Sequence, residues 1–143
     1  MKKTSLGIIF ALCIAGLFFS GCKKYPDGPT FSFRSRSTRL SGTWYIDHYF
    51  INGTDQTSTQ VAFWGADYVL NIVSDGTYQI YGNFPDNGTC SFEDKQSEFY
   101  LQSYSTGTLK ENYTILKLEF KSLWVKHTNS KGDLEEIHYI AYR

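Results

Sequence analysis

Hydrophobic and polar residues alternate in short runs from Leu40 to the end of the 143-residue chain, with almost no helical periodicity. Eight of these runs predict strands, at residues 42–50, 67–73, 77–82, 89–93, 98–104, 113–120, 123–128 and 134–142. The predicted turns include Asn52-Gly53, Ser74-Asp75-Gly76, Pro85-Asp86-Asn87-Gly88 and the loop 129–133. The pattern therefore predicts an all-β domain.

Two arrangements of eight antiparallel strands fit this alternation, a closed barrel and a β-sandwich. We favour the barrel because closure leaves no exposed sheet edge. It also encloses an interior that side chains fill or that holds one small ligand. Residues 54–65 lack a clear strand pattern and predict a loop or a short helix over one end.

The alternation also predicts which side chains face inward. In the first strand, the inner face is expected to carry Trp44, Ile46, His48 and Phe50, and the outer face Tyr45, Asp47 and Tyr49. The candidate ligand-lining residues are Trp44, Tyr68, Leu70, Tyr78, Ile80, Phe92, Leu116, Leu118 and Tyr139, with Leu123, Val125 and Ile137 on the same inner face. Such side chains either fill the core or line an apolar pocket for a small amphipathic ligand.

The first 21 residues have the three parts of a secretory signal peptide. Met1-Lys2-Lys3 is positively charged, residues 6–19 are apolar, and Ser20-Gly21-Cys22 provides small residues for cleavage. The apolar run of 14 residues is shorter than the roughly 20 that a transmembrane helix needs. We therefore expect a cleaved signal peptide and no membrane-spanning helix there.

Charge divides the mature chain into a basic stem, residues 22–39, and an acidic domain, residues 40–143. The stem has five basic side chains against one acidic, and the domain has seven basic against thirteen acidic. A basic stem suits anionic lipid head groups, or is simply a solvated linker. Its second half, residues 31–39, is expected to lie along the domain as an edge segment. The acidic domain argues against nucleic acid as a partner, because phosphate binding requires positive charge.

The candidate catalytic and metal-ligating residues form no recognised motif. Cys13 lies in the signal peptide, so Cys90 is expected as a small buried side chain without a disulfide partner. The three histidines, His48, His127 and His138, lack the spacing of a metal site and are expected to be hydrogen-bonded or on the surface.

Two pairs of adjacent carboxylates, Glu135-Glu136 and Glu93-Asp94, are expected on opposite strand faces as solvated charges. No catalytic residue, metal or cofactor is therefore predicted. An enzyme would require a cleft that holds a histidine within hydrogen-bond reach of a carboxylate or of Cys90.

Two short motifs carry a resemblance to known families. Phe19-Ser20-Gly21-Cys22 resembles the bacterial lipobox, which implies that cleavage leaves Cys22 as a lipidated first residue. Leu40-Ser41-Gly42-Thr43-Trp44 resembles the Gly-x-Trp that opens the first strand of lipocalins. Together with the stem sequence Tyr25-Pro26-Asp27-Gly28-Pro29, the chain resembles bacterial lipocalin-like lipoproteins.

This resemblance implies a lipocalin-like barrel with a binding role and no catalysis. It also implies that Trp44 packs at the closed end of the barrel beneath a basic side chain from a late strand, for which Arg143 is the candidate. The expected location is the envelope of a Gram-negative bacterium, anchored in the outer membrane through Cys22. The periplasmic face is favoured because no acidic cluster resembling a surface-export tag follows Cys22.

Two functions remain open at this stage. The first is binding of a small apolar or amphipathic ligand inside the barrel. The second is a structural or protein-interaction role in an envelope complex, through an exposed tyrosine-rich surface. The tyrosines expected on that surface are Tyr45, Tyr49, Tyr81, Tyr100 and Tyr104.

Overall fold

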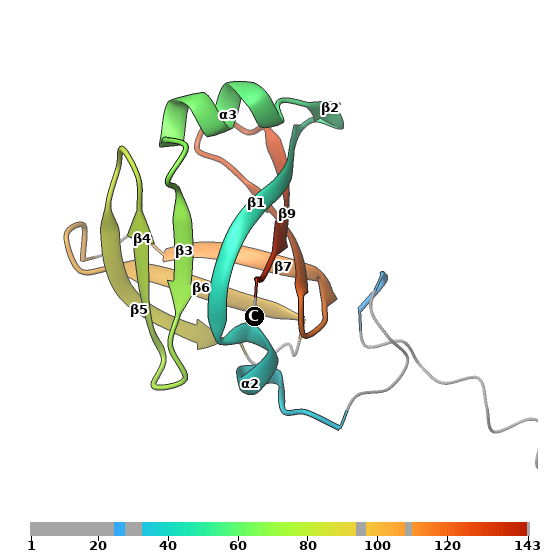
Figure 1. Cartoon of the computed structure of the whole chain (residues 1–143), viewed down its shortest axis with the longest axis vertical. Helices are drawn as coiled ribbons and strands as arrows, with labels where there is room; N and C mark the ends of the chain where they lie inside the picture. The colour runs from blue at the N-terminus through green and yellow to red at the C-terminus, as the bar shows by residue number, and fades with distance from the viewer. Residues whose placement is uncertain (1–24, 28–32, 94–96, 108–109, 143) are drawn as a thin grey trace, which may run out of the picture.

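Eight antiparallel strands form a closed barrel in the computed structural model of the chain, which describes residues 25–27, 33–93, 97–107 and 110–142 (Figure 1). The barrel strands are β1 (Gly42–Ile51), β3 (Val69–Ile72), β4 (Thr77–Tyr81), β5 (Asp86–Phe92), β6 (Glu98–Ser103), β7 (Lys110–Leu118), β8 (Ser122–Thr128) and β9 (Leu134–Ile140). They pair in chain order, and β1 also pairs with β9. The prediction of a closed barrel rather than a sandwich is confirmed. Residues 1–24, which include the expected signal peptide and Cys22, lie outside the described residues.

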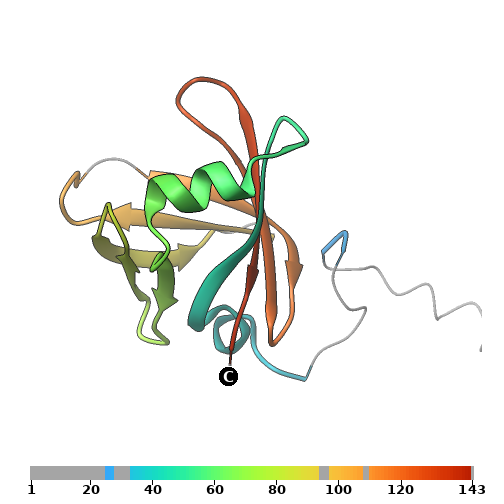
Figure 2. The ribbon, with the colours of Figure 1, turned by 45° about the horizontal axis from the view of Figure 1, so that its top comes forward.

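Strand β1 closes the barrel because it pairs with two different neighbours along its length. Its first residues, Gly42 to Trp44, pair with β3, and its remainder from Tyr45 to Ile51 pairs with β9. The strand curves around the barrel to make both contacts (Figure 2). At its end, the predicted Asn52-Gly53 turn leads into the short strand β2 (Thr54–Asp55).

Two short helices lie at opposite ends of the barrel (Figures 1 and 2). Helix α2 (Arg36–Leu40) precedes β1 and is capped by Ser35, whose Oγ accepts from the Thr38 N–H at 3.1 Å. We call this end, with the turns 74–76 and 119–121, the closed end. Helix α3 (Thr57–Trp64) lies at the other end with the loops 82–85, 104–107 and 129–133, and we call this end the mouth. The expectation of an edge segment at 31–39 was wrong for residues 36–39, which belong to α2, and residues 31 and 32 lie outside the described residues.

A register shift in β1 reverses the predicted faces of that strand. Ile46 pairs with Tyr139 and His48 pairs with His138, so Asp47 is an extra residue without a directly opposed partner. Beyond this bulge the alternation changes phase, and Tyr49 is buried in the core while the His48 side chain is 50% exposed. The predictions of an inward His48, an inward Phe50 and an outward Tyr49 were wrong for this reason, and the Phe50 ring packs against His138 on the outer face.

A second register shift in β7 places Leu116 outside the core. Ile115 pairs with Val125 and Lys117 with Trp124, which leaves Leu116 as the extra residue. Leu116 is buried but is not part of the core cluster, and its carbonyl accepts a hydrogen bond from the Asp27 N–H at 3.0 Å. The inward face of β7 is formed by Tyr113 and Ile115 before the bulge and by Leu118 after it.

At the closed end, Trp44 is fully buried and its Nε1 donates to the Leu40 carbonyl at 2.8 Å. A basic side chain is buried at this end, as the resemblance implies, but it comes from α2. Arg39 donates through Nη1 to the Leu118 carbonyl at 2.7 Å, and the Tyr25 ring beside it is 1% exposed. Arg143, the expected basic residue, lies outside the described residues.

Strand β5 begins three residues earlier than predicted, because Asp86 to Gly88 pair with β4 instead of forming a turn. Gly88 lies opposite Tyr78, and a Cβ atom at Gly88 would come within 2.0 Å of the Gln102 carbonyl oxygen and 2.8 Å of the Tyr78 ring. The glycine is therefore required by close packing between strands and not by a turn conformation.

Candidate functional site: a cavity at the barrel mouth

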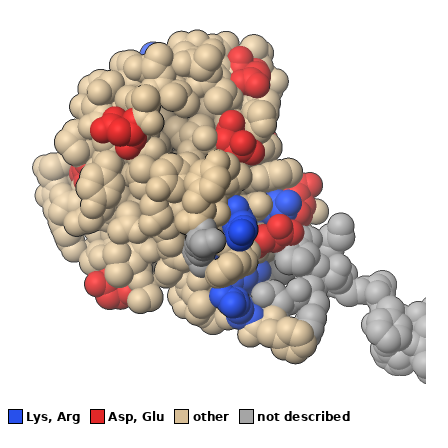
Figure 3. Space-filling view, viewed as in Figure 1, with Lys and Arg blue, Asp and Glu red and all other residues tan. Residues whose placement is uncertain are grey.

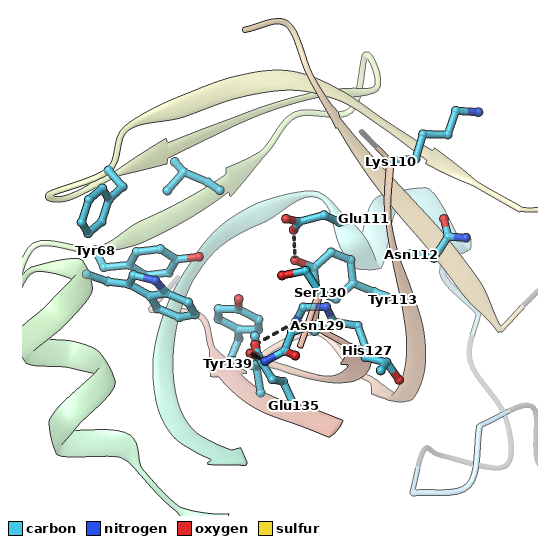
Figure 4. A pocket seen from close by; sticks show the side chains of 15 residues that line it. Tyr68, Lys110, Glu111, Asn112, Tyr113, His127, Asn129, Ser130, Glu135 and Tyr139 are labelled. Atoms are coloured by element: carbon cyan, nitrogen blue, oxygen red, sulfur yellow. Dashed lines mark hydrogen bonds and ion pairs between the residues drawn. The ribbon is translucent and has the colours of Figure 1, made fainter. Parts of the chain in front are cut away.

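A cavity of about 770 Å³ opens at the mouth of the barrel (Figure 4). One wall is formed by the end of α3, the start of β3 and the loop after β4, and the other by the start of β7 and the β8–β9 hairpin. The aromatic lining residues are Trp64, Tyr68, Phe84, Tyr113 and Tyr139. The volume is in the range of small-molecule sites, which are about 300–1,000 Å³.

The inward faces of three neighbouring strands change from apolar to polar as they approach the mouth. Counted toward the mouth, these inward residues are Ile115, Tyr113 and Glu111 in β7, Leu123, Val125 and His127 in β8, and Tyr139, Ile137 and Glu135 in β9. Each series ends at the cavity in a glutamate or histidine side chain, above a buried and largely apolar floor. The period of two residues along a strand is what aligns these groups.

Glu135 is held by a network of hydrogen bonds at the cavity wall. Its Oε2 lies 3.0 Å from His127 Nε2, and its Oε1 accepts from Asn129 Nδ2 at 2.7 Å. Burial works to raise the pKa of Glu135, but the hydrogen bonds from His127, Tyr49 and Asn129 outweigh it and lower the pKa to about 2. The carboxylate is therefore ionised at neutral pH. The prediction that Glu135 is a solvated charge was wrong, since its side chain is only 12% exposed.

Glu111 lies on the same wall as this network, in the neighbouring strand β7, and accepts a hydrogen bond from Tyr113. The Tyr113 hydroxyl donates to Glu111 Oε2 at 2.6 Å. Burial, together with the charge and the hydrogen bond of Glu111, raises the pKa of Tyr113 well above its ordinary value. Tyr113 therefore stays protonated and remains a donor to the carboxylate.

Helix α3 contributes the wall that faces these carboxylates. The Trp64 ring stacks on Tyr68, with centroids 4.7 Å apart, and meets the edge of Tyr49 at 5.3 Å. The helix end is held against the barrel by the Asn83 N–H, which donates to the Trp64 carbonyl at 2.6 Å. Gly82 permits this approach, because a Cβ atom there would lie 2.5 Å from the same carbonyl oxygen.

A smaller cavity of about 290 Å³ lies beside the first and shares Ile80, Phe84 and Glu111 with it. Its polar group is Asp86, whose two carboxylate oxygens accept from the Tyr78 hydroxyl and from Ser103 Oγ, both at 2.6 Å. This carboxylate is thus satisfied by neutral donors.

The nine candidate ligand-lining residues have three different locations. Tyr68, Ile80 and Tyr139 line the large cavity, and Tyr78 lines the small one. Trp44, Leu70 and Leu118 are buried in the core, and Phe92 packs partly buried against it. Leu116 is at the β7 bulge. The lower part of the barrel is therefore occupied by core side chains, and both cavities described here lie toward the mouth.

Sequence reasoning missed five residues that define the cavity: Trp64, Glu111, Tyr113, His127 and Glu135. For Glu135 the signal was present, since it precedes the inward Ile137 and Tyr139 by one and two steps of the strand period. The same holds for His127 after Val125. For Glu111 and Tyr113 the β7 bulge hid the phase, and no sequence pattern placed Trp64 over the mouth.

His127 and Glu135 have the geometry of a histidine oriented by a carboxylate, the pair that an enzyme would require. Among the described residues, no hydroxyl or thiol group hydrogen-bonds to His127. Cys90 is buried, as predicted, and burial raises the pKa of its thiol to about 12. Within the described residues, no three His, Cys, Asp or Glu side chains are grouped so that they could hold a metal ion.

The other two histidines are on the outer face of the barrel. The His138 ring stacks on Trp124 with centroids 4.0 Å apart, and its Nε2 lies 2.7 Å from Glu136 Oε1. His48 lies next to His138 across the β1–β9 ladder, with Asp47 and Asp55 within 4 Å of its ring nitrogens. The expectation that the three histidines are hydrogen-bonded or on the surface is confirmed.

The expected tyrosine-rich surface loses one of its members. Tyr49 is buried, whereas Tyr81 and Tyr104 are at least half exposed. Tyr45 and Tyr100 are partly exposed, and the ring of Tyr45 meets the edge of Tyr142 at 5.4 Å.

No protein-family model matches the chain, and no curated protein aligns significantly with it. The likeness to lipocalins therefore consists of the short motifs and of the closed eight-stranded barrel. Among the residues that the structure describes, no helix has both the length and the apolar character needed to cross a membrane.

Proposed function

We propose that this protein is a lipid-anchored lipoprotein of the bacterial cell envelope that binds a small amphipathic ligand in the mouth of its barrel, without catalysis. The observation that carries the proposal is the 770 Å³ cavity at the mouth, above a floor of buried core side chains. Its lining combines aromatic faces with a few fixed polar groups. This is the composition expected of a site that orients an amphipathic molecule.

The position of the stem supports an anchor at the end opposite the cavity. Tyr25 is buried in the core, and the Asp27 N–H bonds to Leu116 near the end of β7. Cys22 precedes Tyr25 by three residues, which span at most roughly 11 Å. A lipid on Cys22 would thus hold the barrel close to the membrane by its closed end, with the mouth directed away from the bilayer.

The charge distribution agrees with this orientation. Most of the Lys and Arg side chains visible in Figure 3 lie toward its lower right, on the side of α2, whereas Asp and Glu are spread over the body. Arg34 and Arg36 at this end lie over the rings of Phe120 and Phe92, at 4.3 and 4.0 Å from the ring centroids. Basic groups here are suited to anionic head groups, at about 1 kcal/mol for each well-placed charge.

The absence of catalysis in the proposal is supported by the state of the reactive groups. The buried Cys90 thiol, with its raised pKa, forms little thiolate at neutral pH. His127 is engaged by Glu135, and no described nucleophile lies within hydrogen-bond reach of it. A binding site accounts for His127 and Glu135 without requiring the nucleophile that an enzyme would need.

The experiment is purification of the full chain from membranes, followed by mass spectrometry of bound small molecules and proteins. Ile80→Trp fills the cavity from β4, and Ile140→Trp on the outer face of β9 is the matched control. We expect a stoichiometric small molecule on the wild type and on Ile140→Trp, and none on Ile80→Trp. A stoichiometric protein without a small molecule would instead support the interaction role.

A further inference from the structure

The charge inside the mouth cavity is negative. Four ionisable side chains other than tyrosine line it: Lys110, Glu111, His127 and Glu135. Lys110 points away from the cavity (Figure 4), and its Nζ lies 4.3 Å from the centroid of the Tyr100 ring. Its positive charge is therefore directed to the outer surface, while both carboxylates point inward.

The two carboxylates differ in their partners. Glu135 is surrounded by three donors, one of which is His127. Glu111 accepts from the neutral Tyr113 hydroxyl, and no cationic side chain of the described residues forms an ion pair with it. Glu111 is thus the carboxylate whose charge is available to a ligand.

The charge of Glu111 acts on the tyrosines of the lining. Burial is the main cause that raises the pKa of Tyr68 to about 12 and the pKa of Tyr139 well above its ordinary value, and in both cases Glu111 raises it further. The same carboxylate adds to the raised pKa of Tyr78 in the neighbouring cavity. An anion placed among these residues would be repelled in the same way that the tyrosinate forms are.

The wall opposite Glu111 is aromatic and suits the apolar body of a ligand. Trp64 and Tyr68 are stacked on each other and give this wall a large apolar surface. Glu111, near the start of β7, is exposed, so a cationic group can reach its carboxylate from the mouth. Ring faces and a carboxylate on facing walls form a site for an apolar body that carries a positive group.

We infer that the mouth cavity selects an organic cation, an amphipathic amine whose ammonium group lies against Glu111 and whose apolar body lies against the wall of Trp64 and Tyr68. This inference rests on the proposed ligand-binding function and adds the chemical class of the ligand. It gives a role to Glu111, the carboxylate of the mouth cavity that accepts a hydrogen bond only from a neutral donor among the described residues.

The test compares three probes with one apolar body: tryptamine is a cation, tryptophol is neutral and indole-3-propionate is an anion. Each is titrated by calorimetry into the full chain held in phosphatidylcholine nanodiscs, with empty nanodiscs as the blank. We expect tryptamine to bind at least about tenfold more tightly than tryptophol, which corresponds to one charge-assisted contact. Indole-3-propionate should bind more weakly than tryptophol.

Two variants locate the charge responsible. Glu111→Gln should remove the preference for tryptamine over tryptophol. Glu119→Gln removes the same charge at the closed end, where Glu119 pairs with Lys117, and should keep the preference. Thermal unfolding of each variant reports whether it is folded.

The possible results distinguish the selection of a cation from the proposed ligand-binding function. If tryptophol or indole-3-propionate binds as tightly as tryptamine, the selection of a cation is wrong but the binding cavity stands. If the preference survives in Glu111→Gln, the assignment to Glu111 is wrong. If none of the three probes binds, both the inference and the proposed ligand-binding function are overturned.

Discussion

His127 and Glu135 lie directly opposite each other in the β8–β9 ladder, with His127 Nε2 3.0 Å from Glu135 Oε2 at the barrel mouth. The two side chains are each 12% exposed. A cross-strand pair at this position joins the hairpin that forms one wall of the cavity. The shape of this cavity wall therefore depends on the ionisation of Glu135.

Acid should destabilise the fold through Glu135. Because hydrogen bonds lower its folded-state pKa to about 2 from an ordinary value of 4.5, the ionised form stabilises the native state above pH 4.5. This stabilisation is lost as the pH falls from 4.5 toward 2. Glu135→Gln should cost about 1–3 kcal/mol at neutral pH and weaken the dependence on acid, as measured by urea unfolding at several pH values.

The control for this prediction is Glu136→Gln. Glu136 is the next residue in β9 and is on the outer face, where it contacts His138. This variant should keep the acid dependence of the wild type. Equal acid dependence in wild type and Glu135→Gln would contradict the role given to the network.

Gly88→Ala should destabilise the barrel by about 2 kcal/mol or more. The added Cβ would lie 2.0 Å from the Gln102 carbonyl oxygen, which belongs to a paired strand and moves only with its neighbours. Gly107→Ala is the comparison, because it is a loop glycine with open space around it and a φ of +62°, so its cost is about 1 kcal/mol. Urea unfolding of both variants measures the difference, and equal losses would refute the packing explanation.

Occupancy of the mouth should be visible in tryptophan fluorescence. Trp64 lines the cavity, whereas Trp44 is buried in the core and Trp124 stacks on His138 outside the barrel. A bound ligand should change the emission of the wild type and of Trp124→Phe, but not that of Trp64→Phe. A change that persists in Trp64→Phe would place the ligand elsewhere.

Cys22→Ser should release the protein from the membrane. If Cys22 carries the lipid, its loss removes the acyl chains that contribute about 0.8 kcal/mol for each buried CH₂, and the basic stem does not replace them. Cell fractionation and intact-mass measurement of wild type and variant test this. Cys90→Ser, at the buried thiol of β5, is the matched control and should remain in the membrane fraction.

Much of the barrel was predictable because alternation and turn chemistry are local properties. The Ser74-Asp75-Gly76 turn formed as predicted, with Asp75 Oδ1 accepting from the Thr77 N–H at 2.9 Å. Every predicted strand is present, although several of their ends moved by two to three residues. The candidate site was less predictable, because only three of nine expected lining residues reach the large cavity.

The sequence by itself determined the strands, their order, the acidic character of the domain and the terminal motifs that point to Cys22. Each of these depends on neighbouring residues or on composition. Only the tertiary structure decided which Glu, His and Tyr side chains meet at the mouth. The bulges at Asp47 and Leu116 change the phase of two strands, and closure of β1 on β9 joins residues about ninety positions apart. Such register shifts arise from packing around a closed barrel, and the local pattern of one strand does not contain that information.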